Sequence, residues 1–204
     1  MSSTYLSVDL DYFNEKPLRE MTKLFSIMLR RIPPKNILLV ETHEDLLPHV
    51  LANKPQLLVN VDTHSDFCED ATVASFPHCG NWVNFSKAEK YRWLAPNREV
   101  TAYYRIGSWG NKIWAGEGRC DSTEHFFSKK CAHMRNIKDS AIWYGLSRIP
   151  WDTVGCVGIA VSLEYTEPHV VREFVDNIYP GLRGEAGISV SMGTETYAEV
   201  FLRD

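Results

Sequence analysis

The chain has 204 residues, of which 44% are hydrophobic and 24% are charged, and its formal net charge is −4. This length fits a single domain over 1–204 with a sizeable core, and the composition is typical of a soluble globular protein. The acidic balance and the lack of a basic block argue against a nucleic-acid partner or an anionic membrane surface. No apolar run is long enough to span a bilayer and no signal-peptide pattern opens the chain, so we expect a cytoplasmic protein.

Short apolar runs alternate with segments of helical period along the chain. In chain order they predict a strand at Tyr5–Leu10, a helix at Leu18–Arg31, a strand at Asn36–Val40, a helix at Leu46–Asn53, a strand at Gln56–Val61, a helix at Trp82–Trp93, strands at Val100–Tyr104 and Cys156–Leu163, and a helix at Glu167–Ile178. Several of these strands are apolar on both faces, as buried parallel strands are. The alternation predicts an α/β fold, a single three-layer αβα domain with a mostly parallel sheet.

Residues 105–135 follow neither period. This segment is interpreted as a long loop or a small irregular subdomain. Its aromatic, glycine-rich part, 105–118, contains Trp109 and Trp114 and could form an open groove for a peptide. The tail, Gly187–Asp204, fits a strand, a helix or a flexible end.

The segment Asp62–Asp66 reads Asp-Thr-His-Ser-Asp and closes a predicted strand. In an extended chain, residues at i, i+2 and i+4 share one face, so Asp62, His64 and Asp66 would point into one pocket. Two carboxylates and an imidazole placed together are typical metal ligands, although a solvated turn at a strand end would also explain them. We favour the metal site for this triplet.

Asp9 and Asp11 lie at the end of the first predicted strand in a similar way. For this pair alone, strand-end caps and metal ligands explain the pattern equally well. If they converge with Asp62 and Asp66, four negative charges meet and repel one another, and two divalent cations would balance them. Oxygen-rich sites with an imidazole suit Mn²⁺, and less often Zn²⁺, Fe²⁺ or Mg²⁺.

These residues resemble a known family. The segment Asp62–Asp66 resembles the DxHxD signature of the ureohydrolases, the arginase and agmatinase superfamily, and Ser7–Asp11 resembles its SxDxD signature. His43, after the strand that ends at Val40, resembles the metal-binding histidine upstream of DxHxD. The SxDxD-like segment comes first here and late in ordinary arginases, which implies an arginase-like fold with a permuted motif order.

A divergent branch of that superfamily is more similar still. Its motifs VExHExL, DxHxD, Gly-Asn-Trp and VDLDYF resemble Val40–Leu46, Asp62–Asp66, Gly80–Trp82 and Val8–Phe13 of this chain. The branch includes peptide arginases, which convert arginine residues of ribosomally made precursor peptides into ornithine. The resemblance therefore implies an arginine-containing precursor peptide as partner and substrate.

The resemblance also implies a role for each matching residue. Two Mn²⁺ ions would be bridged by Asp62 and Asp9; His43 and Asp66 would complete one ion, and His64 and Asp11 the other. Glu164, at the end of the last predicted strand, would pair with the substrate guanidinium.

Three residues near Gly80 have weaker assignments. His78 is a candidate proton shuttle, or else a loop histidine. Asn81 and Trp82 could shape the substrate channel, although Trp82 could equally belong to the core.

The implied reaction is hydrolysis of the guanidinium group by a hydroxide that bridges the two metal ions, giving ornithine and urea. One alternative keeps this chemistry on free arginine, agmatine or another small guanidino compound. Another, of a different class, is a non-catalytic, metal-stabilised module that binds a peptide. A two-metal phosphoesterase is disfavoured because no basic cluster near the motifs could hold phosphate.

Overall fold

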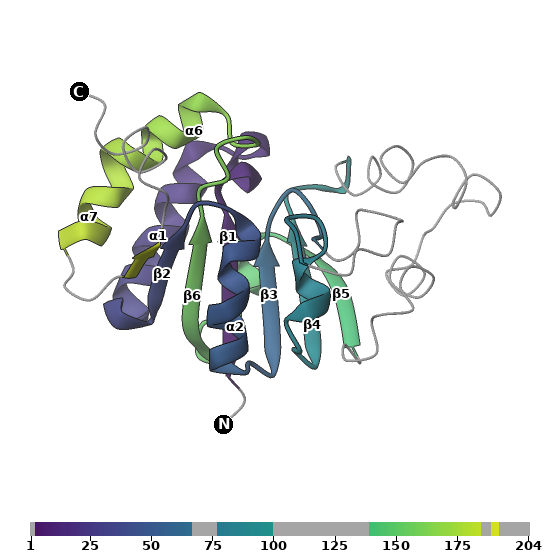
Figure 1. Ribbon diagram of the computed structural model, residues 1–204. Coiled ribbons are helices and arrows are strands. Elements are labelled where there is room, and N and C mark those ends of the chain that lie inside the picture. Colours follow the sequence, from purple (N-terminus) through teal and green to yellow (C-terminus); the bar gives the residue numbers. More distant parts are fainter. Residues whose placement is uncertain (1–2, 67–76, 100–138, 185–188, 192–204) are drawn as a thin grey trace.

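The computed structural model describes residues 3–66, 77–99, 139–184 and 189–191, and its strands form one parallel sheet (Figure 1). The sheet has seven strands in the order β5-β4-β3-β1-β6-β2-β7, and every described pairing is parallel. The strands are β1 (Thr4–Asp9), β2 (Ile37–Val40), β3 (Leu57–Val61), β4 (Lys90–Ala95), β5 (Asp139–Tyr144), β6 (Val154–Ala160) and β7 (Ser189–Ser191). The predicted α/β class with a parallel sheet is confirmed.

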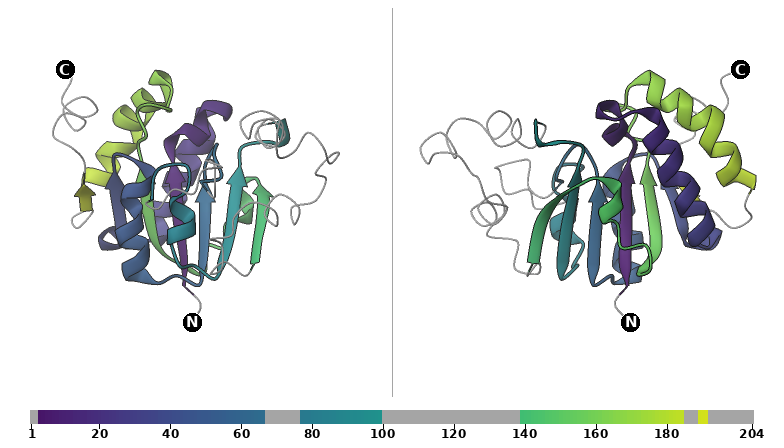
Figure 2. Two further views of the ribbon diagram at one scale, coloured as in Figure 1. Left: turned by 45° about the vertical axis from the view of Figure 1, so that its right-hand side comes forward. Right: turned by 180° about the vertical axis from the view of Figure 1, so that it is seen from behind.

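One face of the sheet is covered by α1 (Leu18–Arg31), together with α6 (Pro168–Glu173) and α7 (Tyr179–Gly184). The helix α1 lies behind the strands in Figure 1 and in front of them in the right-hand view of Figure 2, with α6 and α7 beside it at the edge of the sheet. The helix α1 places apolar residues at helical spacing, and Met21, Leu24, Phe25 and Met28 are buried. They belong to a core cluster that also contains Leu6 and Val8 of β1.

The opposite face is covered by α2 (Leu47–Asn53), together with the short 3-10 helices η3 (His43–Leu46) and η4 (Trp82–Phe85). Leu46, Val50 and Trp82 pack there against Tyr5 of β1 in a second core cluster. Because alternate residues of a strand face opposite sides, Ser7 and Asp9 lie on the same side as Tyr5. Helices on both faces make the predicted three-layer αβα domain.

Gly158 of β6 sets how closely η3 approaches the sheet. A Cβ atom at this position would lie 2.5 Å from both Leu46 Cδ2 and Tyr5 Oη. Leu46 and Tyr5 are fully buried, so neither side chain has room to move away. The missing side chain at Gly158 therefore allows η3, which contains His43, to lie directly on the strands.

Two of the predicted elements are wrong in kind or in extent. The predicted helix Trp82–Trp93 is instead η4 followed by β4, because the side chains of Tyr91, Trp93 and Ala95 alternate onto the face covered by η4. The strand β5 was not predicted. The predicted helix Glu167–Ile178 continues to Gly184 through a π-helical turn, η6 (Phe174–Ile178), just before Pro180, which has no N–H to donate.

Several predictions fall outside the residues that the structure describes. These are the strand Val100–Tyr104, the irregular segment 105–135 with its candidate groove, and most of the tail Gly187–Asp204. Within the described ranges, no helix is both long and apolar enough to cross a membrane.

The strand order gathers the ends of four strands that are distant in sequence. The central strand β1 lies between β3 and β6, and β2 lies on the far side of β6. The chain leaves β1 towards one side to form β2 and returns to the other side to form β3, which is a reversal of strand order of the kind that opens a crevice at the carboxyl ends of the strands. Any ligand bound by this sheet is expected in that crevice.

Candidate metal centre

The predicted ligands emerge side by side from the ends of these strands. Val8 of β1 pairs with Val61 of β3, so Asp9 and Asp62 follow directly on neighbouring strands. Ala160 of β6 aligns with both Asp9 and Val40, and the chain after Val40 turns into η3 and brings His43 back over the site. Register alone therefore aligns residues that are more than thirty positions apart in the sequence.

Asp9, His43 and Asp62 form the first group that could hold a metal ion. Their exposed fractions are 4%, 2% and 0%. His43 Nδ1 lies 3.3 Å from Asp9 Oδ2 and 3.0 Å from Asp62 Oδ2. Asp66 borders the group, with its Oδ2 atom 2.7 Å from the same nitrogen.

Asp11, Asp62 and His64 form the second group. His64 Nδ1 lies 2.8 Å from Asp11 Oδ2 and 3.7 Å from Asp62 Oδ1. Asp62 is therefore common to both groups, with one oxygen towards each histidine. A carboxylate placed in this way could bind two neighbouring cations, one with each oxygen. All six predicted metal ligands thus lie together, but of the two bridging residues that the resemblance implies, only Asp62 belongs to both groups. Asp9 belongs to the first group alone, and Asp66 borders that group without being part of it.

The His43 ring shows that the first group fits a cation. Its Nε2 atom is hydrogen-bonded to Ser7 Oγ, while its buried Nδ1 atom has no hydrogen-bond partner in the described part of the chain. A neutral His43 that donates Nε2–H to Ser7 presents the lone pair of Nδ1 to three carboxylates. This arrangement is repulsive unless a proton or a metal ion lies between them, and an imidazole fixed by its other nitrogen is a common feature of metal sites.

The two histidines retain protons strongly when no metal ion is bound. Burial opposes the charged form of His43, but the nearby carboxylates, Asp66 foremost, raise its pKa well above the usual value. Burial likewise opposes protonation of His64, and Asp11 and Asp62 outweigh it and raise its pKa. Divalent cations would replace these protons, so metal binding is expected to release protons.

The carboxylates respond differently to the same crowding. Burial, followed by the charges of Asp9 and Asp62, raises the pKa of Asp11 well above its usual value, although His64 opposes this. For Asp62, burial also favours the neutral acid, but its contacts with His43 and His64 outweigh burial and hold its pKa well below the usual value. The shared carboxylate of Asp62 thus stays ionised more readily than that of Asp11.

Hydrogen bonds from outside the ligand set fix the carboxylates. Ser162 Oγ donates to Asp9 Oδ2 at 2.7 Å, and Trp82 Nε1 donates to Asp66 Oδ2 at 2.7 Å. Asn60 Nδ2 donates to Asp62 Oδ2 at 3.1 Å. Each hydrogen bond leaves the carboxylate with further lone pairs. These donors therefore orient the carboxylates and leave lone pairs available for a metal ion.

Two residues of the site have backbone in the left-handed region. Asp66 has φ 47° and Ser162 has φ 46°. This conformation costs free energy for residues other than glycine and is concentrated at functional sites. Here it turns the chain sharply after β3 and β6, so that the Asp66 carboxylate meets His43 and the Ser162 hydroxyl meets Asp9.

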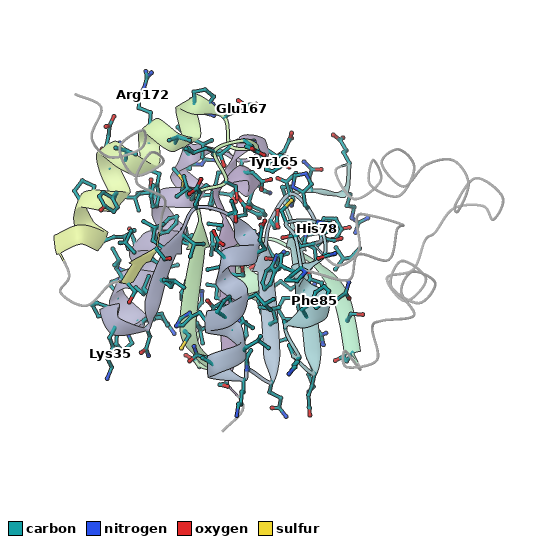
Figure 3. All side chains as sticks on the ribbon, in the orientation of Figure 1. Lys35, His78, Phe85, Tyr165, Glu167 and Arg172 are labelled. Atoms are coloured by element: carbon teal, nitrogen blue, oxygen red, sulfur yellow. The ribbon has the colours of Figure 1, made fainter. Side chains whose placement is uncertain are left out.

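A pocket opens over the ligands at the carboxyl end of the sheet. Tyr165 marks this end of the molecule in Figure 3, and Lys35 projects from the other end. The described lining comprises Asp9, Glu41, Thr42, His43, Glu44, His64, Asp66, Cys79, Gly80, Ser162, Leu163, Glu164 and Tyr165. Five of these residues are acidic and none is Lys or Arg, so this part of the pocket favours a cation.

The remaining predicted site residues lie around this pocket at different depths. Glu164 lines it and is exposed. His78 is not among its lining residues; its Nδ1 atom accepts from Gly80 N–H, and its buried Nε2 atom has no described hydrogen-bond partner. Asn81 accepts a hydrogen bond from His78 N–H, and Trp82 is fully buried beneath His43.

The sequence did not reveal Ser7, Ser162 or Glu44 as parts of this site. Ser7 lies two residues before Asp9 on the same strand face, so the period of β1 contained a usable signal. Ser162 lies two residues before Glu164 but owes its position to a left-handed turn, which no local pattern predicts. Comparisons with protein-family models, with curated proteins and with solved structures found no match for the chain.

Proposed function

We propose that the protein is a binuclear metal-dependent hydrolase that acts on the guanidinium group of arginine residues in a precursor peptide and gives ornithine and urea. The observation that carries the proposal is the Asp62 carboxylate, shared between two groups of Asp and His side chains that are all buried except the partly exposed His64. Oxygen donors with one imidazole in each group suit Mn²⁺. Glu164 remains a candidate partner for the guanidinium and His78 a candidate proton shuttle.

Hydrolysis of a guanidinium needs a stronger nucleophile than water, because the group is resonance-stabilised and protonated at neutral pH. Two divalent cations bound by these ligands would lower the pKa of a water molecule from ~15.7 toward ~7 and so supply that nucleophile. A C–O bond then forms at the guanidinium carbon, the C–N bond to the arginine side chain breaks, and the departing amine takes up a proton. The residues of the chain would bind the metal ions, pair with the positive charge of the guanidinium and deliver the proton to the departing amine.

The acidic pocket supports a guanidinium substrate over a phosphate ester. A phosphate ester would bring negative charge next to Glu41, Glu44 and Glu164, with no Lys or Arg in the described lining to receive it. The same lining offers no cation for the α-carboxylate of free arginine. Arginine within a peptide has no such carboxylate beside it, and neither does agmatine.

Urea release with and without Mn²⁺ tests the proposal. An arginine-containing peptide, free arginine and agmatine are incubated with the protein after metal removal and again after Mn²⁺ is added. Metal-dependent urea from the peptide, with little from the two small compounds, is the expected result. Release mainly from agmatine or arginine would support the small-guanidine alternative, and Mn²⁺ binding without urea from any substrate would favour a non-catalytic peptide-binding module.

A further inference from the structure

Glu44 carries a buried carboxylate oxygen without a visible partner. Its Oε2 atom has no hydrogen-bond partner among the described residues. A buried carboxylate oxygen in this condition is costly, because the charge has lost water and gained no donor in return. Such an atom needs an explanation, and a cationic ligand that donates N–H groups supplies one.

The position of Glu44 is rigid and close to the ligands. It is the residue after His43 in the first turn of η3. A capping box fixes that turn, with Thr42 Oγ1 donating to Asp45 Oδ2 at 3.0 Å. At its other end, η3 is anchored by Leu46, which is fully buried. A side chain on such a segment is held more precisely than one on a loop.

Glu44 also faces the pocket. It lines the same pocket as His43 and Asp66, and Cys79 lies on that lining too. The pKa of the Cys79 thiol is raised by burial and, next, by the Glu44 carboxylate, which places the two side chains near each other in the pocket. Neither group that could hold a metal ion includes Glu44, so its charge is available to another cation.

We infer that Glu44 is the carboxylate that binds the substrate guanidinium, a role that rests on the proposed function. A guanidinium presents N–H donors in a planar fork that matches a carboxylate. Glu44 is better suited to this than Glu164, because Glu164 is exposed and water screens an ion pair there. Glu164 then lies at the rim of the pocket, where its charge attracts the cation before it enters.

Binding can be measured apart from turnover by using the paramagnetism of Mn²⁺. N-Methylguanidinium is added to the Mn²⁺-loaded protein, and the relaxation rate of its methyl protons reports binding close to the metal ions. The same measurement is made on Glu44→Gln, on Glu164→Gln and on Glu15→Gln, a control in which an exposed carboxylate outside the described pocket lining is neutralised. Mn²⁺ content and thermal unfolding are recorded for every variant.

Glu44→Gln is expected to keep its Mn²⁺ and its stability while binding N-methylguanidinium roughly 10- to 100-fold more weakly, the loss of a charge-assisted pair. For the peptide substrate, kcat/KM is expected to fall by a similar factor. Unchanged binding in Glu44→Gln would overturn the inference, as would a larger loss in Glu164→Gln.

The design separates this inference from the proposed function. If the wild-type protein releases no urea but binds N-methylguanidinium in a Glu44-dependent way, the hydrolase proposal fails and the role of Glu44 stands. If urea is released and Glu44→Gln is as active as wild type, the role of Glu44 fails and the function stands. A wild-type protein that does not bind the guanidinium at all would also overturn the inference.

Discussion

Replacing Asp11 with Asn is expected to change the stability of the protein in opposite directions without and with Mn²⁺. Without metal, the Asp11 carboxylate is 1% exposed, and burial together with Asp9 and Asp62 raises its pKa, so its ionised form is unfavourable at neutral pH. Asparagine has the same shape and no charge. Its oxygen can accept from Thr63 N–H in place of the contact now made at 3.2 Å, and protonated His64 keeps its contact with Asp62.

The size of the metal-free effect follows from the cost of a buried charge. Removing the charge is expected to raise the free energy of unfolding of the metal-free protein by about 1–3 kcal/mol. For a chain of this length each kcal/mol shifts the unfolding temperature by about 2–4 °C, so the variant should melt about 2–12 °C higher than wild type. Because the folded-state pKa of Asp11 is raised, the gain should be present at neutral pH. It should vanish below about pH 3.8, where the carboxyl is protonated in both the folded and the unfolded chain.

With Mn²⁺ the wild-type protein is expected to be the more stable of the two, because Asp11 belongs to the second ligand group with Asp62 and His64. Each ion bound at about 100 times its Kd stabilises the folded protein by about 2.7 kcal/mol. Asn is a neutral and weaker ligand, so Asp11→Asn should lose most of the stabilisation that the ion of this group supplies. The increase in unfolding temperature on adding Mn²⁺ should therefore be smaller for the variant by about 5–11 °C.

Thermal unfolding followed by circular dichroism checks both halves of this prediction. Wild type, Asp11→Asn and the exposed control Glu15→Gln are melted in chelator and in excess Mn²⁺, at several pH values. The control should match wild type in every condition. If Asp11→Asn is less stable than wild type in chelator at neutral pH, or keeps the full Mn²⁺ stabilisation, the electrostatic reasoning about the site is wrong.

Three further substitutions test the construction of the site. Asp62→Asn should abolish both ions together, because both groups include this carboxylate, and titration calorimetry with Mn²⁺ should show no tight site. Trp82→Phe keeps an aromatic ring but removes the N–H that donates to Asp66, so Mn²⁺ affinity should fall by about 10- to 100-fold, measured by competition with a chelator. Gly158→Ala forces a Cβ against Leu46 and should cost about 1–3 kcal/mol of unfolding free energy in urea denaturation, whereas Gly155→Ala, where nothing lies within 4 Å, should not show this clash.

Asp9 and Asp62 were predictable because their positions depend on strand geometry. The extended segment expected at Asp62–Asp66 is wrong: the chain bends after β3, and Asp66 reaches the site through a left-handed turn. An apolar run followed at once by Asp places that side chain at the carboxyl end of a strand, and parallel strands bring these ends to one edge of the sheet. Asp9 and Asp62 follow such runs, and His43 comes three residues after another, at Val40. The three strands concerned lie within one or two residues of their predicted limits. The rule needs no knowledge of which strands are neighbours.

Elements that depend on tertiary contacts were not predictable in the same way. Trp82, Phe85 and Trp93, at i, i+3 and i+11, fall on one side of a helical wheel, so these three aromatic residues resemble one face of a helix. In the fold, Tyr91 and Trp93 face η4 from a strand instead, and Trp93 Nε1 donates to the carbonyl of Asp62. The buried oxygen of Glu44 could not be predicted from the local sequence either, because its lack of a described hydrogen-bond partner depends on the tertiary surroundings.

The topology explains how a motif at the start of the chain can contribute to the same site as motifs that come later in the sequence. In a parallel sheet, each strand is joined to the next by a crossover, so the position of a strand in the sheet is independent of its rank in the sequence. Here β1 is first in the chain and central in the sheet, between β3 and β6. Asp9 and Asp11 therefore meet Asp62 from the neighbouring strand, and Ser162 reaches Asp9 from the other side. The order of the motifs along the chain thus places no limit on the site, since only the adjacency of strand ends decides which ligands converge.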